Sequence, residues 1–135
     1  MVRAVKRTAL LIGLLLAAAC GNGAGNLTEL DRARAERLEV VLLSSREAIR
    51  HGTDEFVVEI RSAQDGGLVD VGTVKGAASM PMGGTPMMGR IDVTRTNLPG
   101  RYGVKSDLSM AGTWRMTFEW SGPPPGSVTL SRSVQ

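Results

Sequence analysis

The sequence is short of the residues on which most catalytic and metal sites depend. Its 135 residues include one cysteine, Cys20, and one histidine, His51. A single cysteine cannot form a disulfide within the chain, so a folded core must rest on packing alone. One imidazole without a second imidazole or a thiolate cannot complete a zinc site. We therefore expect His51 to be an ordinary surface side chain.

Signals of catalysis and of nucleic-acid binding are also missing. The carboxylates are scattered, the serines lack a nearby base motif, and Gly83-Gly84 is not followed by the Lys-Ser/Thr of a phosphate loop. We expect no enzyme. The 16 basic residues exceed the 13 acidic ones only because three of them precede Cys20, which leaves 13 of each sign after it. Without a basic stripe carrying interleaved aromatic residues, we expect no nucleic-acid partner.

The chain begins with a leader. Arg3, Lys6 and Arg7 precede an uninterrupted small and apolar run over residues 9–19. A basic region, a short apolar region and small residues before a cleavage point are typical of a secretory signal peptide. Because this apolar run is too short to span a bilayer as a helix, we predict a signal peptide over residues 1–19.

The end of the leader resembles a bacterial lipoprotein lipobox. Leu16-Ala17-Ala18-Ala19 precedes Cys20, although alanine stands at Ala17, where leucine is usual. The resemblance implies that Cys20 is lipidated and becomes the mature N-terminus, tethered to a membrane. Gly21 after the cysteine implies the outer membrane, facing the periplasm, in a cell with two membranes. The alternative is a soluble exported protein cleaved nearby.

The remaining chain predicts one small all-β domain. We expect residues 20–37 to form a linker, with a glycine-rich tether followed by a solvated segment or short helix over 28–37. From residue 38 to residue 135 the apolar residues mostly alternate, which predicts an immunoglobulin-like antiparallel β-sandwich of about seven strands. In the clearest strand, Trp114, Met116, Phe118 and Trp120 share one face. The expected strands cover residues 38–44, 56–60, 68–74, 91–94, 102–108, 114–120 and 128–134.

Several fragments, in order and spacing, resemble the YtkA-like family of small exported β-sandwiches, which is related to FixH-like proteins. The resemblance covers residues 38–120. It depends on the fragments Gly52-Thr53-Asp54-Glu55-Phe56, Met80-Pro81-Met82, Pro99-Gly100-Arg101-Tyr102 and Leu108-Ser109-Met110-Ala111-Gly112-Thr113-Trp114.

This resemblance implies an immunoglobulin-like fold and a place in the cell envelope. Similar domains occur beside the periplasmic adaptors of heavy-metal efflux pumps, and FixH-like relatives are associated with copper oxidase assembly. An efflux adaptor or an oxidase-assembly protein is therefore the partner that the resemblance implies. Some relatives carry a histidine in or beside the methionine loop, and this chain has none there, which argues against tight Cu(II) binding.

The segment 80–89 concentrates methionine in a stretch rich in proline and glycine, where we expect a loop. Thioethers are soft ligands that select Cu(I) over Zn, Mg or Ca, so the methionines are candidate ligands of copper. They could equally fill irregular gaps in the core, and a third alternative is an adhesive surface for a partner. Met116 belongs to the core. The candidate metal ligands are Met80, Met82, Met87, Met88 and Met110.

Two functions remain open at this point. The first is a lipid-anchored envelope β-sandwich that binds or handles copper through its methionine loop. The second is a structural or interaction lipoprotein that docks on an envelope complex and binds no metal. The run Pro123-Pro124-Pro125 is most simply a stiff connection in a hairpin.

Overall fold

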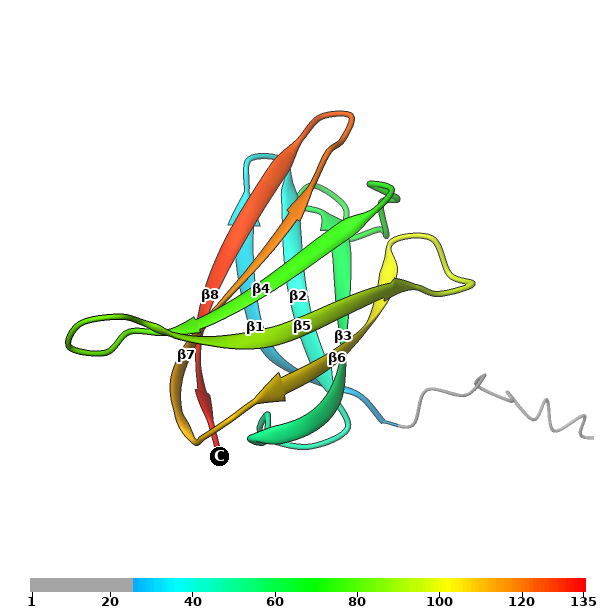
Figure 1. Ribbon diagram of the computed structural model, residues 1–135. Coiled ribbons are helices and arrows are strands. Elements are labelled where there is room, and N and C mark those ends of the chain that lie inside the picture. The colour runs from blue at the N-terminus through cyan, green and yellow to red at the C-terminus, as the bar shows by residue number, and fades with distance from the viewer. Residues whose placement is uncertain (1–25) are drawn as a thin grey trace, which may run out of the picture.

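A computed structural model describes residues 26–135 (Figure 1). The predicted signal peptide, Cys20 and Gly21 lie outside this range. Eight antiparallel strands make up the fold, and residues 26–135 contain no helix long and apolar enough to cross a membrane. The strands are β1 (Thr28–Ala35), β2 (Leu38–Ser44), β3 (Gly52–Ser62), β4 (Val74–Met80), β5 (Met87–Arg95), β6 (Arg101–Leu108), β7 (Gly112–Trp120) and β8 (Gly126–Val134).

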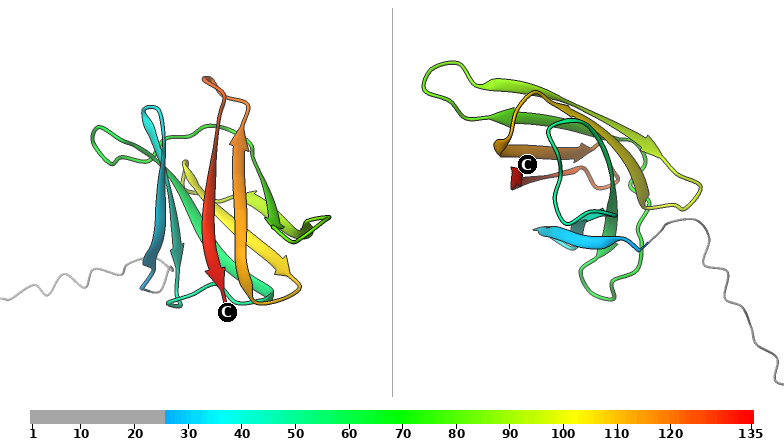
Figure 2. Two further views of the ribbon diagram at one scale, coloured as in Figure 1. Left: turned by 90° about the vertical axis from the view of Figure 1, so that its left-hand side faces the viewer. Right: turned by 90° about the horizontal axis from the view of Figure 1, so that it is seen from below.

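One strand, β5, belongs to both layers of the fold. Its first residues pair with the end of β4, whereas the stretch from Arg90 to Arg95 pairs with β6. The strand order β1-β2-β3-β6-β5-β4-β7-β8 therefore folds over at β5 into two facing layers (Figure 2). At the other side, Arg132 of β8 donates a hydrogen bond of 2.9 Å to the Leu30 carbonyl of β1. The expected immunoglobulin-like β-sandwich is confirmed, with eight strands instead of seven.

The core lies between the layers. Trp114, Met116 and Phe118 are fully buried and Trp120 is nearly so, which confirms the face predicted for β7. Tyr102 is also buried, and its hydroxyl donates a hydrogen bond of 2.7 Å to the Gly72 carbonyl. Burial raises the pKa of this hydroxyl. The packing of large side chains from β6 and β7 thus replaces the disulfide that the chain cannot form.

The prediction of a linker or short helix over residues 28–37 is wrong for most of that segment. Residues 28–35 form β1, which pairs with β2, and the sandwich begins there and not at residue 38. Leu30, Ala33 and Ala35 pack against the core, while Arg32 points outward and bonds Glu29 and Glu39. The local pattern is weak because two of its three inward residues are alanine and the third, Leu30, lies at a bulge between Glu29 and Asp31. Pairing with β2 decides the conformation.

The strand predicted over residues 68–74 is displaced. Residues 69–73 form an irregular segment, and the strand runs from Val74 to Met80. The Asp70 carboxylate accepts the Gly72 N–H at 2.9 Å, and Gly72 has a φ of 77°, so the backbone turns where an extended strand was expected. The two valines at 69 and 71 still pack on the core, which explains the alternation in the sequence.

Gly76 of β4 lies close against two side chains of β5. A Cβ added there would lie 2.2 Å from Cγ2 of the buried Ile91 and 3.1 Å from Cγ2 of Val93. We expect Gly76→Ala to lower the free energy of unfolding by about 1–3 kcal/mol, because Ile91 must move out of a packed core. Urea unfolding followed by circular dichroism measures this loss. Gly83→Ala, where an added Cβ meets nothing within 4 Å, is the matched control, and equal losses in the two variants would contradict the prediction.

Candidate metal site

The methionine segment is a β-hairpin that projects beyond the body of the sandwich (Figure 1). Met80 ends β4 and Met87 begins β5, and these two residues are directly paired across the hairpin. Residues 81–86 form the connecting loop. The expectation of a loop throughout 80–89 is therefore wrong at both ends, because the prolines stand only at the ends of the connection, where no ladder hydrogen bond is lost.

Pairing places two thioethers together. Residues directly opposite in an antiparallel pair point to the same face, so the Met80 and Met87 side chains lie next to each other. Met80 is 9% exposed and belongs to the core cluster, while Met87 is half-buried and packs against that cluster. The pair thus sits where the core ends and the hairpin begins.

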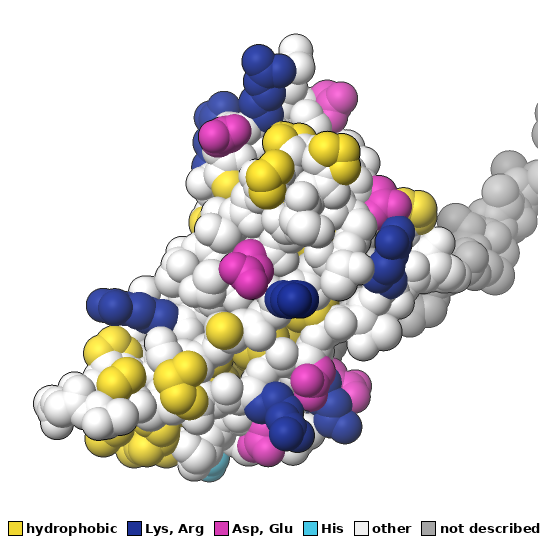
Figure 3. Space-filling view, turned by 45° about the horizontal axis from the view of Figure 1, so that its top comes forward, with side chains coloured by type: hydrophobic (Ala, Val, Ile, Leu, Met, Phe, Trp, Pro, Cys, Tyr) yellow, Lys and Arg dark blue, Asp and Glu magenta, His cyan; other side chains and the backbone are white. Residues whose placement is uncertain are grey.

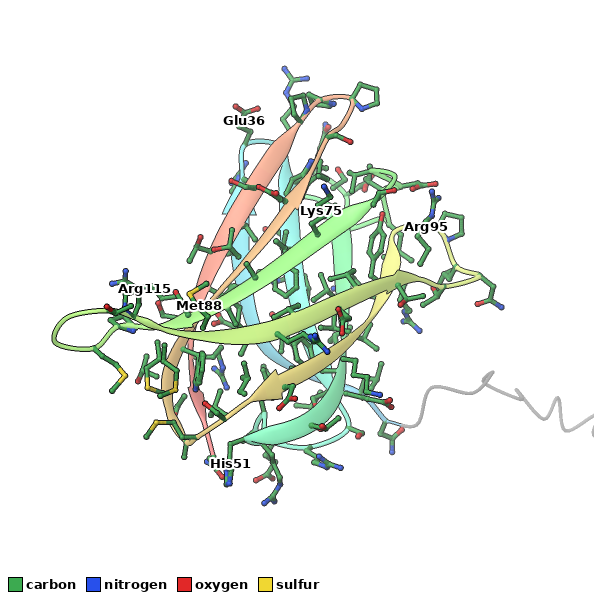
Figure 4. The ribbon with its side chains drawn as sticks, in the orientation of Figure 1. Glu36, His51, Lys75, Met88, Arg95 and Arg115 are labelled. Atoms are coloured by element: carbon green, nitrogen blue, oxygen red, sulfur yellow. The ribbon has the colours of Figure 1, made fainter. Side chains whose placement is uncertain are left out.

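Met88 lies on the other face of β5. Successive residues of a strand point to opposite sides, and Met88 is 66% exposed. Figure 4 shows Met88 on the upper side of the hairpin, with a group of sulfur atoms below it. The divergence of Met87 and Met88 follows the strand geometry, and it separates Met88 from the paired thioethers.

The turn between β6 and β7 contacts both members of the pair. The Ser109 hydroxyl donates to the Met87 Sδ at 3.0 Å. On the other side of the turn, Gly112 has a φ of 142°, and a Cβ added there would lie 2.6 Å from the Met80 Cε. The positive φ favours glycine at this position, and the absence of a side chain leaves room for the end of the Met80 side chain.

Met110 stands on this turn, between the two contacting residues. Its carbonyl accepts a hydrogen bond of 2.9 Å from Nε1 of the buried Trp114, which fixes the turn to the core. Its side chain is 42% exposed, and that of Met82, on the hairpin loop, is 49% exposed. The structure therefore brings Met80, Met87 and the Met110 turn together, with Met82 on the adjoining loop. Figure 3 shows hydrophobic side chains on both sides of the hairpin tip.

The donors available at this end of the sandwich are neutral thioethers. Within residues 26–135 no group of three or more His, Cys, Asp or Glu side chains could hold a metal ion. His51 is exposed, as expected, and its Nδ1 lies 3.0 Å from the carbonyl of Gln135. A set made of thioethers suits Cu(I) and does not suit Zn²⁺, Mg²⁺ or Ca²⁺. Of these four ions, the residues present fit Cu(I) alone.

A second feature is a cavity of about 450 Å³ bounded by the turn between β1 and β2, the irregular segment after β3 and the connection between β7 and β8. Its apolar lining includes Val69, Val71, Trp120 and the three prolines 123–125. Trp120 pairs with Gly126, so the prolines form the expected hairpin connection. The Trp120 Nε1 is buried, and it has no hydrogen-bond partner in the described part of the chain.

Sequence reasoning missed two residues of the methionine end, Ser109 and Gly112. Gly112 carries a signal, since a glycine just before a strand often marks a backbone conformation that other residues avoid. Ser109 carries none, because its contact with Met87 joins positions 22 residues apart.

Comparison with known proteins shows similarity to a family model and to a solved structure. The model of the YtkA-like family matches residues 32–119. The crystal structure of the Lin-41 filamin domain is similar to this chain with a TM-score of 0.48 and 17% identity, over 71% of this chain and 91% of that one. No curated protein was found to match the chain.

Proposed function

The chain belongs to the YtkA-like family, and from that premise we propose that it is a lipid-anchored β-sandwich of the cell envelope that binds copper as Cu(I). The observation that carries this proposal is the pairing of Met80 with Met87 beside the Met110 turn. Three soft donors at one end of a rigid sandwich, from the buried Met80 to the exposed Met110, suit a monovalent soft cation. Met82, on the loop above them, is the candidate fourth donor.

The leader supports the location in this proposal. A signal peptide over residues 1–19 followed by Cys20 is the pattern of an exported lipoprotein, attached to the outer membrane and facing the periplasm. In that compartment a domain meets copper ions that the cytosol sequesters. A copper-handling lipoprotein would serve a heavy-metal efflux adaptor or an oxidase-assembly protein, the partners associated with similar domains.

A titration with Cu(I), in competition with a chromophoric Cu(I) chelator, tests the proposal. We expect the purified protein to bind one Cu(I), and the variant with Met80, Met87 and Met110 all changed to leucine to lose at least about 100-fold in affinity. Loss of outer-shell support alone typically costs about 10- to 100-fold, and this variant loses the ligands themselves. Leucine replaces methionine with little change of volume, so the fold should persist.

Met88→Leu is the matched control for this experiment. It removes an exposed thioether from the same strand, on the face away from Met87. We expect its Cu(I) affinity to equal that of the parent. A parent that binds no Cu(I), or a triple variant that binds it as tightly as the parent, would refute the proposed function.

The apolar cavity favours a second candidate function, an interaction lipoprotein that binds no metal. The lining of this cavity is largely apolar, and the buried Trp120 N–H in its wall has no hydrogen-bond partner within residues 26–135, so a segment of a partner that entered the cavity could accept a hydrogen bond from it. A parent without Cu(I) affinity would leave this function as the better one. The two candidate sites lie at different places on the sandwich.

A further inference from the structure

The hydrogen bond from Ser109 to Met87 affects the affinity that the methionine site would have for a metal ion. A thioether sulfur has two lone pairs and is a weak hydrogen-bond acceptor. At 3.0 Å from Sδ, the Ser109 hydroxyl occupies one of these lone pairs. The same lone pairs are the ones that a soft cation needs.

The surroundings of Met87 leave few directions from which a cation can approach. One side of the side chain packs against the core cluster, and Met80 lies opposite it on the same face. The turn between β6 and β7 also contacts the Met87 side chain, through the Ser109 hydroxyl. A cation that reached Met87 from this turn, on which Met110 is the next residue, would have to displace that hydroxyl.

We propose that the Ser109 hydroxyl competes with Cu(I) for the Met87 thioether, which weakens the site and suits it to exchange rather than storage. This inference rests on the proposed function and deepens it. Binding requires the hydroxyl to turn away from Sδ. Ser109 is exposed, so a released hydroxyl can bond to water instead, and the competition is reversible.

The variant Ser109→Ala tests the competition. A net hydrogen bond of ordinary strength corresponds to a factor of about 2–10 in an equilibrium constant, so we expect Ser109→Ala to bind Cu(I) about 2- to 10-fold more tightly than the parent. Ser109→Thr keeps the hydroxyl at the same position and is the matched control, with the affinity of the parent. The affinities come from competition with the chromophoric Cu(I) chelator.

A second background shows whether the effect acts through Met87. In Met87→Leu the thioether is gone, so we expect Ser109→Ala to leave the residual Cu(I) affinity unchanged there, which is the result of a double-mutant cycle with strong coupling. The ε-methyl NMR signal of Met87 should also shift in Ser109→Ala before any metal is added.

The outcomes separate the inference from the proposed function. A parent that binds Cu(I) but gains nothing from Ser109→Ala, or loses affinity, overturns the inference and leaves the proposed function standing. An equal gain in the Met87→Leu background also overturns it. A parent that binds no Cu(I) overturns both.

Discussion

Trp114→Ala is expected to lower the free energy of unfolding by about 3–5 kcal/mol, the range typical of aromatic side chains removed from a core. Trp114 is the largest side chain that is fully buried. It stands on β7, which lies between β4 and β8 in its layer. Its indole also reaches β5, because a Cβ added at Gly89 would lie 3.1 Å from the Trp114 Cζ3. The cavity left behind would open where the hairpin joins the core.

The hydrogen bond of the Trp114 indole nitrogen contributes separately to stability, and a pair of further variants isolates this contribution. Trp114→Phe and Trp120→Phe remove the same atoms, but only Trp114 loses a hydrogen bond, the one to the Met110 carbonyl. We expect Trp114→Phe to cost about 1 kcal/mol more than Trp120→Phe. Urea unfolding followed by far-UV circular dichroism measures all three variants. A Trp114→Ala protein within 1 kcal/mol of the parent would contradict this assignment of the core.

The difference between β7 and β1 shows what the sequence could and could not predict about the fold. In β7 the inward residues are large and apolar and the outward ones polar, so alternation alone identified the buried face. In β1 the inward residues include two alanines, and a bulge between Glu29 and Asp31 breaks the period. Its strand conformation comes from pairing with β2, which no local window contains.

The candidate site divides in the same way. Adjacent residues of a strand diverge, so the separation of Met87 from Met88 could be predicted once a strand was assumed. The pairing of Met80 with Met87 required the register of the hairpin, and the glycines and prolines of its loop argued for a loop throughout. The contacts of Ser109 and Gly112 with these methionines depend on how the β6–β7 turn meets the hairpin, which is a tertiary relation.

Removing both arginines that surround Glu59 is expected to destabilise the protein at neutral pH by about 3–5 kcal/mol, since it leaves a buried carboxylate without a partner. Glu59 lies on β3 with its side chain 3% exposed. Arg61 donates to Oε1 from Nε at 3.0 Å and also from Nη2. Arg101, its pairing partner on β6, donates to Oε2 at 2.7 Å. Both arginine side chains remain about a quarter exposed (26% and 28%).

The stabilities of the parent and of the Arg61→Ala/Arg101→Ala double variant should change in opposite directions with pH. In the parent, burial alone would raise the pKa of Glu59, but the hydrogen bonds from Arg61 and Arg101 outweigh it and the pKa is lowered. A carboxylate with a lowered pKa contributes stability above its unfolded pKa of about 4.3, and that stability is lost as the pH falls through the folded pKa. In Arg61→Ala/Arg101→Ala only burial remains, so we expect the pKa to be raised instead.

A raised pKa of Glu59 reverses the way in which stability depends on pH. The double variant should be least stable at neutral pH and should regain stability as the pH falls toward about 4.3, while the parent begins to lose it. The urea midpoints of the parent and the double variant should therefore differ widely at pH 7 and lie closer together near that lower pH. Arg95→Ala, which removes the exposed ion pair with Asp70, is the control and should cost at most about 1 kcal/mol. The double variant could instead lose the same free energy of unfolding, relative to the parent, at both pH values. That result would show that the destabilisation comes from lost packing of the arginine stems and not from the charge of Glu59.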